Sequence, residues 1–129
     1  MSEPHDRGRH LLDLVLFCRK SCKELARWSG LTVEESLSVG LLHVHPPSSV
    51  KELSRSLGVN ASQTSRILRS LEEKGLISRS LNTADRRVED VSLTPRGIRV
   101  AEKLLEHAES VMEHATSLVR YVMADSEAG

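Results

Sequence analysis

The hydrophobic spacing of this chain changes at Gly75. Before that glycine, apolar residues recur at helical intervals in two short segments, 50–57 and 61–74, with only a tight turn between them. After it they alternate, first over 76–82 and then over 88–93, as in the two strands of a hairpin. Two short helices followed at once by a hairpin predict a winged helix-turn-helix, a mainly α fold of the α+β class.

Capping residues predict where the helices begin. Thr32 with Glu35, and Ser49 with Glu52, have the spacing of capping boxes, and Asn60 is a third cap. Gly75 is typical of the residue that ends a helix. In the helix after Thr32, the residues expected to face the core are Val33, Leu37 and Leu41.

The segment 61–74 has the pattern expected of a recognition helix. Its inward residues are Thr64, Ile67, Leu68 and Leu71. The residues left outside are Ser62, Gln63, Ser65, Arg66 and Arg69. Gln can bond adenine, Arg can bond guanine, and Ser can bond bases or phosphate. The alternative is an ordinary solvated face, but the first half of this face carries no carboxylate, which favours DNA.

The predicted hairpin has a charged tip, with a five-residue loop at 83–87. Asp85 precedes two adjacent arginines, Arg86 and Arg87, whose like charges repel each other. The tip is either simply solvated or placed to meet an anion, and a narrow minor groove attracts inserted arginine. Asp85 could hold one guanidinium in place. Lower in the hairpin, Arg79 and Glu89 could pair on the shared face.

The distribution of charge adds to this argument. The net charge of the 129 residues is zero, which alone speaks against nucleic acid. Residues 48–99, however, hold ten Lys and Arg against six Asp and Glu, and the rest holds eight against twelve. The middle of the chain is therefore the candidate anion-binding region.

The last predicted helix begins with Thr94 as its cap and Pro95 in its first turn. Its heptad positions are Ile98, Ala101, Leu105, Ala108, Met112, Ala115, Val119 and Val122, widened by Leu104, Val111 and Leu118. So much apolar surface requires a cover. The first helix of the same chain could supply it, but one small domain cannot easily cover nearly four heptads. Self-association as a homodimer is therefore favoured.

The first predicted helix, 9–28, has a wide apolar face and is expected to be buried on more than one side. Its apolar residues are Leu11, Leu12, Leu14, Val15, Cys18, Cys22, Leu25 and Ala26. The two cysteines, four residues apart, are either small buried residues or an oxidant or metal sensor acting with His10, His43 or His45. Burial is the favoured interpretation.

The sequence divides into N-terminal supporting helices (1–47), a DNA-binding winged helix-turn-helix (48–93) and a dimerisation helix (94–129). We expect a soluble, cytoplasmic protein, since no apolar run approaches ~18 residues and no signal-peptide pattern is present. No metal-site spacing, Gly-rich phosphate loop or nucleophile motif occurs. We therefore expect no metal, no cofactor and no enzymatic activity.

The stretches "SVKELSRSLGVNASQTSRILRSLEEKGLISRS" and "DRRVEDVSLTPRG" resemble the MarR family of winged helix-turn-helix transcription regulators. The likeness covers about residues 48–99, with looser agreement in the two preceding helices. It implies a homodimer, usually a repressor relieved by a small ligand, an oxidant or a metal. It also implies that Ser62, Gln63, Ser65 and Arg66 read the major groove. Arg87, supported by Asp85, would enter the minor groove and leave Arg86 for phosphate.

The sequence departs from the family pattern after its long helix, where members commonly have a further one. The dimer interface would then consist of the first and last helices, paired like a coiled coil. A pseudo-palindromic operator would follow from two-fold symmetry. The alternatives left open are a winged helix used for protein contacts and a redox- or metal-responsive regulator that uses Cys18 and Cys22.

Overall fold

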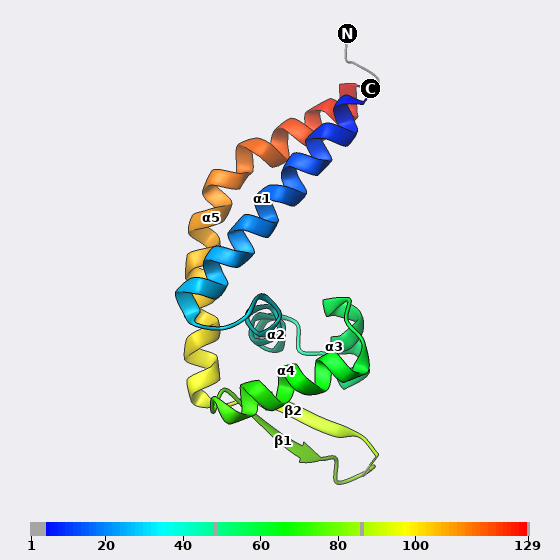
Figure 1. Ribbon diagram of the computed structural model, residues 1–129, viewed down its shortest axis with the longest axis vertical. Coiled ribbons are helices and arrows are strands. Elements are labelled where there is room, and N and C mark those ends of the chain that lie inside the picture. Colours follow the sequence, from blue (N-terminus) through cyan, green and yellow to red (C-terminus); the bar gives the residue numbers. More distant parts are fainter. Residues whose placement is uncertain (1–4, 48, 86, 129) are drawn as a thin grey trace.

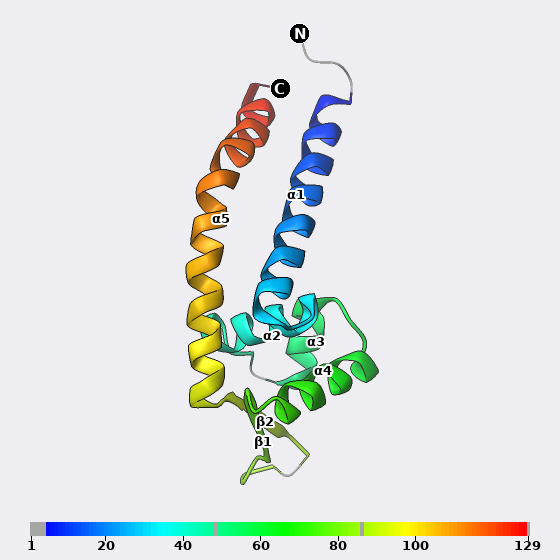
Figure 2. The ribbon, with the colours of Figure 1, turned by 60° about the vertical axis from the view of Figure 1, so that its left-hand side comes forward.

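The computed structural model describes residues 5–47, 49–85 and 87–128. Its elements in chain order are α1 (Asp6–Ser29), α2 (Val33–Val44), α3 (Val50–Leu57), α4 (Ala61–Glu73), β1 (Ile77–Leu81), β2 (Glu89–Leu93) and α5 (Pro95–Ala128). In Figures 1 and 2, α1 and α5 extend together toward both chain ends, and we call them the two-helix arm. The elements α2, α3, α4, β1 and β2 form a head at the opposite end. The predicted winged helix-turn-helix with a long last helix is confirmed.

The predicted caps are present. The side chain of Thr32 accepts the backbone N–H of Glu35 at 3.1 Å, and the carboxylate of Glu35 accepts that of Thr32 at 2.9 Å. Ser49 accepts the N–H of Glu52 at 3.1 Å. The side chain of Asn60 caps α4 in the same way. Each cap satisfies a backbone donor that has no partner within its helix, so the three helices begin where the sequence predicts.

The hairpin is antiparallel, and its outermost pair joins Leu81 to Glu89. The connection between the strands is 82–88, longer than the predicted 83–87. The backbone N–H of Asn82 still donates across the hairpin to the carbonyl oxygen of Val88 at 2.8 Å, and its side chain accepts backbone N–H groups of the loop. The wing therefore has its own internal support.

Aliphatic side chains from both parts of the molecule form the core. Its buried members are Leu31, Val39, Leu42, Leu53, Leu68, Leu71, Leu76, Ile77, Ala101 and Leu104. Among the described glycines, Gly97 near the start of α5 has the closest backbone neighbour. A Cβ atom at that position would lie 2.0 Å from the carbonyl oxygen of Leu76. Glycine at this position lets α5 begin directly against the end of α4 and the start of β1.

The predicted end of α4 is also confirmed, since Gly75 has φ 73°.

The predicted inward face of α2 was right only in part. Leu41 is partly buried and packs against the core, but Leu37 is 44% exposed and Val33 is only partly buried. The buried residues of this helix are Glu35, Ser36, Ser38, Val39 and Leu42. A pattern of apolar residues misses this face because three of its members are polar. They can be buried because each has a hydrogen-bond partner.

The prediction that α1 is buried on more than one side was also wrong for the single chain. Of its described residues only Ala26 is buried, and Leu11, Leu12, Val15 and Leu16 are between 45% and 57% exposed. The reason is that α1 lies along one side of α5 and leaves its opposite side open. On α5, Ala101 and Leu104 are buried but Met112 is 56% exposed. The heptad positions Ala115, Leu118, Val119 and Val122 lie outside the residues whose side chains are described.

Within the described ranges, no helix combines the length and the apolar character needed to cross a membrane.

Candidate nucleic-acid interface

The outer face of α4 carries the polar residues predicted to lie there. The exposed residues are Ser62, Gln63, Ser65, Arg66 and Arg69. Thr64, Leu68 and Leu71 are buried on the opposite face, and Ile67 is partly buried. Figures 1 and 2 place α4 and the hairpin at the end of the molecule farthest from the chain termini. This face is therefore open to a large ligand approaching the head.

Gln63 has a second role that the sequence argument missed. Its side-chain oxygen accepts the backbone N–H of Asn60 at 3.0 Å, and the side chain of Asn60 accepts the N–H of Gln63 at 2.8 Å. Reading adenine in two places requires both the oxygen and the NH₂ group of a glutamine. Because the oxygen already accepts one bond in the cap, the NH₂ group is the part of the Gln63 amide that no hydrogen bond within the described residues engages. The three-residue spacing of the two amides was the available sequence signal.

A buried hydroxyl pair joins the two helices of the helix-turn-helix. Thr64 is 0% exposed, and its hydroxyl lies 2.6 Å from that of Ser54 on α3. It also donates to the carbonyl oxygen of Asn60 at 3.0 Å. These bonds satisfy the buried hydroxyl and fix the angle at which α4 leaves the turn.

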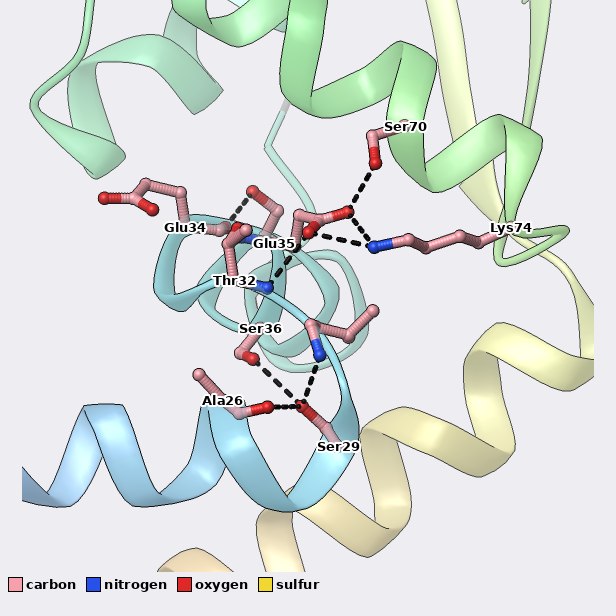
Figure 3. A network of polar contacts seen from close by, with 10 residues as sticks. Ala26, Ser29, Thr32, Glu34, Glu35, Ser36, Ser70 and Lys74 are labelled. Carbon is pink, nitrogen blue, oxygen red and sulfur yellow. Dashed lines mark hydrogen bonds and ion pairs between the residues drawn. The ribbon is translucent and has the colours of Figure 1, made fainter.

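A buried carboxylate attaches α4 to α2 (Figure 3). Glu35 is 2% exposed and accepts the hydroxyl of Ser70 at 2.8 Å and the ammonium group of Lys74 at 2.9 Å. Burial opposes ionisation. The N–H of Thr32, with Lys74 and Ser70, nevertheless holds the pKa of this carboxyl below its ordinary value. The charged form of Glu35 therefore supports the position of α4.

The hydrogen bonds continue from α2 to α1 (Figure 3). The hydroxyl of Ser29, the last residue of α1, lies 3.3 Å from that of Ser36 on α2. It also donates to the carbonyl oxygen of Ala26 at 3.1 Å and accepts the N–H of Leu31 at 3.3 Å. The end of α1 is thus attached to the same helix that supports α4.

At the wing tip, Asp85 holds Arg87. Its carboxylate accepts the side-chain Nε–H of Arg87 at 3.1 Å and the backbone N–H of the same residue at 3.0 Å. These bonds lower the pKa of Asp85. The side chain of Arg87 is nevertheless 91% exposed. The terminal Nη2 of Arg87 also donates to the same carboxylate, at 3.4 Å, so Asp85 holds the guanidinium in one orientation at the exposed tip, where a narrow groove could receive it. Arg86 lies outside the described residues.

Asn82 supports this arrangement and was not predicted. Its side-chain oxygen accepts the N–H of Ala84 at 2.8 Å and that of Asp85 at 3.0 Å. Its NH₂ group lies 3.3 Å from the carboxylate of Asp90 on β2. The result is a chain of contacts from β2 through Asn82 and Asp85 to Arg87. Asparagine next to a turn was the only sequence signal for it.

The predicted pair of Arg79 and Glu89 is present on the shared face of the hairpin. The guanidinium of Arg79 donates twice to the carboxylate of Glu89. This contact lowers the pKa of Glu89 and raises that of Arg79. The pair fixes the wing just below its loop.

The cysteines are more open than expected. Cys18 is exposed and Cys22 is partly buried, so the prediction that both lie on a buried face was wrong for the single chain. Burial and the neighbouring Cys18 raise the pKa of the Cys22 thiol, which lowers its thiolate fraction and its reactivity. Among the described residues, no three His, Cys, Asp or Glu side chains gather into a metal site.

Comparison with known proteins agrees with this geometry. Residues 31–88, which run from the start of α2 through the wing loop, match the profile of the MarR family. Over this segment the chain is similar to the MarR family. The MarR match includes α2, the helix that the structure packs against both α4 and α5.

Named relatives are similar to the same part of the chain. The chain is 36% identical over 76 residues to the HTH-type transcriptional repressor MdtR of Bacillus subtilis (strain 168). That match covers 59% of this chain and 49% of MdtR, so the chain matches about half the length of this curated relative.

Solved structures with a similar fold superpose on most of the chain. A transcriptional regulator from Thermotoga maritima has a TM-score of 0.65 and 28% identity, and the match covers 85% of this chain and 78% of that one. MepR of S. aureus, in its complex with DNA, has a TM-score of 0.67 and 23% identity over 76% of this chain and 73% of MepR. The likeness to MepR concerns the fold.

Proposed function

We propose that this protein is a sequence-specific regulator of transcription that binds double-stranded DNA. The observation that carries the proposal is the pairing of two features on the head. One is the exposed, carboxylate-free first half of the α4 face, and the other is Arg87 fixed on Asp85 at the wing tip. The names of the MarR-family relatives support it.

Different residues would bind different parts of the DNA. Ser62, Ser65, Arg66 and Arg69, with the NH₂ group of Gln63, would contact bases and phosphates in the major groove. Arg87 would enter the adjacent minor groove from its mount on Asp85, and Arg86 would bind phosphate. Residues 48–93 would thus contact DNA, while 1–47 and 94–129 would support this unit and bind a second copy.

The exposed side of the two-helix arm supports a homodimer. Leu11, Leu12 and Val15 on α1 and Met112 on α5 are all more than half exposed. Apolar side chains gathered on neighbouring helices favour association, because their removal from water is worth roughly 25 cal/mol per Å². A two-fold dimer would bind a pseudo-palindromic operator. We assign the protein the role of a repressor, as in the name of MdtR. Expression of a reporter gene controlled by the operator should therefore rise in a strain that lacks the protein.

Selection of bound sequences from a random duplex pool tests DNA binding, half-site symmetry and spacing together. Variants then test the residues. Arg66→Ala should weaken binding to the selected operator by ~1–3 kcal/mol, or roughly tenfold or more, if the guanidinium bonds guanine in two places. Arg87→Ala should weaken binding and reduce its dependence on salt. Lys103→Ala, an exposed change on α5, is the control and should leave the affinity unchanged.

A winged helix that binds another protein is the alternative. If no duplex is enriched in the selection, and Arg66→Ala and Arg87→Ala have no effect on binding to any duplex, the proposed DNA-binding function is wrong. The protein-contact interpretation then takes its place.

A further inference from the structure

Among the exposed residues of the α4 face, Gln63 has the side chain that can donate and accept hydrogen bonds through two separate atoms. The serines of this face carry one hydroxyl each, and Arg66 and Arg69 can only donate. Which bases the face can select therefore depends on which atom of the Gln63 amide is available to DNA.

The orientation of the Gln63 amide is fixed by the chemistry of its partner. The atom that lies 3.0 Å from the backbone nitrogen of Asn60 receives an N–H group. A backbone N–H can only donate, so the atom that receives it is the amide oxygen and not the nitrogen. The two polar atoms of an amide point in different directions from one carbon. The NH₂ group is therefore turned away from the Asn60 N–H, on a side chain that is exposed.

Moving the oxygen to a base would break the cap of α4. The N–H of Asn60 would lose its acceptor, and the turn that the reciprocal bond at 2.8 Å also holds would be weakened. The cap bond also fixes the direction of the second lone pair of the oxygen, so that lone pair cannot be aimed at a base independently. The cap thus favours a contact in which the oxygen stays on Asn60 and the NH₂ group alone reaches the base.

Base edges in the major groove differ in how well they suit a donor. Guanine presents two acceptors, N7 and O6, and thymine presents one, O4. Adenine presents the acceptor N7 beside an amino group, which needs an acceptor of its own, and cytosine presents only an amino group. A side chain that donates and does not accept therefore fits guanine best and finds no partner on cytosine. Arg66, about one turn farther along α4, has the same preference.

We propose that Gln63 contacts its base as a donor only, and that it selects guanine, with thymine second, at one position in each half-site. Adenine, which a glutamine free of the cap would bond in two places, is disfavoured at this position, and cytosine is excluded. This inference rests on the proposed DNA-binding function and specifies part of its sequence preference.

The variant Gln63→Glu tests the inference while keeping the cap. One carboxylate oxygen can still accept the N–H of Asn60, since glutamate is a usual partner in a capping box. The other oxygen replaces the NH₂ group, so a donor becomes an acceptor that suits the amino group of cytosine. Bound sequences are selected from a random duplex pool with the wild type and with the variant. The position at which the preferred base changes should be guanine for the wild type and cytosine for the variant.

Affinities for matched operators measure the size of the change. The operators differ only at this position of both half-sites, and each is labelled with the same fluorophore. The wild type should bind the guanine operator roughly tenfold or more tightly than the cytosine operator, and Gln63→Glu should reverse the order. Each ratio compares two duplexes for one protein, so a general loss of affinity caused by the added charge cancels.

Asn60→Asp is the matched control. It adds the same negative charge at the same end of α4 and keeps a side-chain oxygen that can accept the N–H of Gln63. It should weaken binding to all the operators by a similar factor and leave guanine preferred. Thermal unfolding of both variants verifies that they are folded.

The outcomes separate this inference from the proposed function. If the wild type enriches no duplex, the DNA-binding function itself is wrong. If duplexes are enriched but Gln63→Glu changes the preferred base at no position, Gln63 reads no base and the inference is overturned. Guanine or thymine as the wild-type preference at the changed position supports it. Adenine or cytosine there, or the same change in Asn60→Asp, overturns it.

Discussion

At the scale of single residues, the polar side chains of the head matter as supports as well as contacts. Helical spacing and residue type were enough to predict that Arg66 is exposed, because it lies on the polar face of an amphipathic helix. Arg87 was predicted to be exposed because it lies in a charged loop. Glu35 and Asn82 were not predicted as supports. Their partners are distant in sequence or are backbone groups of the loop, and neither kind of partner appears in an apolar pattern.

Glu35 should make stability depend on pH in the acidic range. Its pKa is lowered in the folded protein, so its contribution is fully present above its unfolded pKa of about 4.3 and is lost as the pH falls through the folded value. Glu35→Gln should therefore reduce the free energy of unfolding by about 1–2 kcal/mol at pH 7, a figure kept small because Lys74 is partly exposed. The difference in the free energy of unfolding between Glu35→Gln and the wild type should become smaller below pH 4.

Urea unfolding at several pH values measures this difference. Glu34→Gln is the matched control, since its side chain is the exposed neighbour of Glu35 and should show little effect at any pH. Equal losses in the two variants would contradict the role assigned to Glu35.

Asn82 should act on DNA binding through Arg87. In Asn82→Ala the backbone N–H groups of Ala84 and Asp85 lose their acceptor, so Asp85 is held less firmly and fixes Arg87 less well. The extra cost of ordering one side chain on binding is about 0.5–1.5 kcal/mol, so operator affinity should fall by roughly twofold to tenfold. Titration of a fluorescent operator measures it, with Thr83→Ala as control. If Asn82→Ala binds like the wild type, the loop does not depend on this side chain.

At the scale of elements, the sequence predicted helix and strand positions better than helix faces. The caps Thr32 and Asn60 and the terminator Gly75 act locally, so they can be interpreted from a few residues. The buried face of α2 depends on which neighbours supply partners for Glu35 and Ser38, and only the tertiary structure determines that. The openness of α1 in the single chain follows in the same way from the position of α5.

The junction between β2 and α5 should be intolerant of added volume. In Gly97→Ala the new Cβ would lie 2.0 Å from the carbonyl oxygen of Leu76, a backbone atom that cannot turn aside. The free energy of unfolding should fall by about 2–3 kcal/mol or more. Gly40→Ala is the control within α2, where no atom lies within 4 Å of the added group. It should instead gain about 0.5–1 kcal/mol.

Thermal and urea unfolding at pH 7 measure both glycine variants. If Gly97→Ala is as stable as the wild type, the close approach of α5 to Leu76 is not needed for stability and the prediction is wrong.

At the scale of the whole molecule, the division between head and arm follows from where the apolar residues gather. The heptad pattern of α5 correctly indicated a long helix with apolar surface left over, because that pattern is a property of one segment. It did not indicate that α1 covers only one side of α5, a feature that requires the two helices to be placed together.

The attachment of α2 has a consequence for how this protein could respond to signals. One end of α2 is bonded to α4 through Glu35 and to α1 through Ser36, and the same helix packs along α5. Through α2, the helix α4 is therefore attached to both helices of the arm. In the proposed homodimer, a rotation of α1 against α5 would move α4 as well and would change the spacing at which the two copies reach successive turns of a duplex.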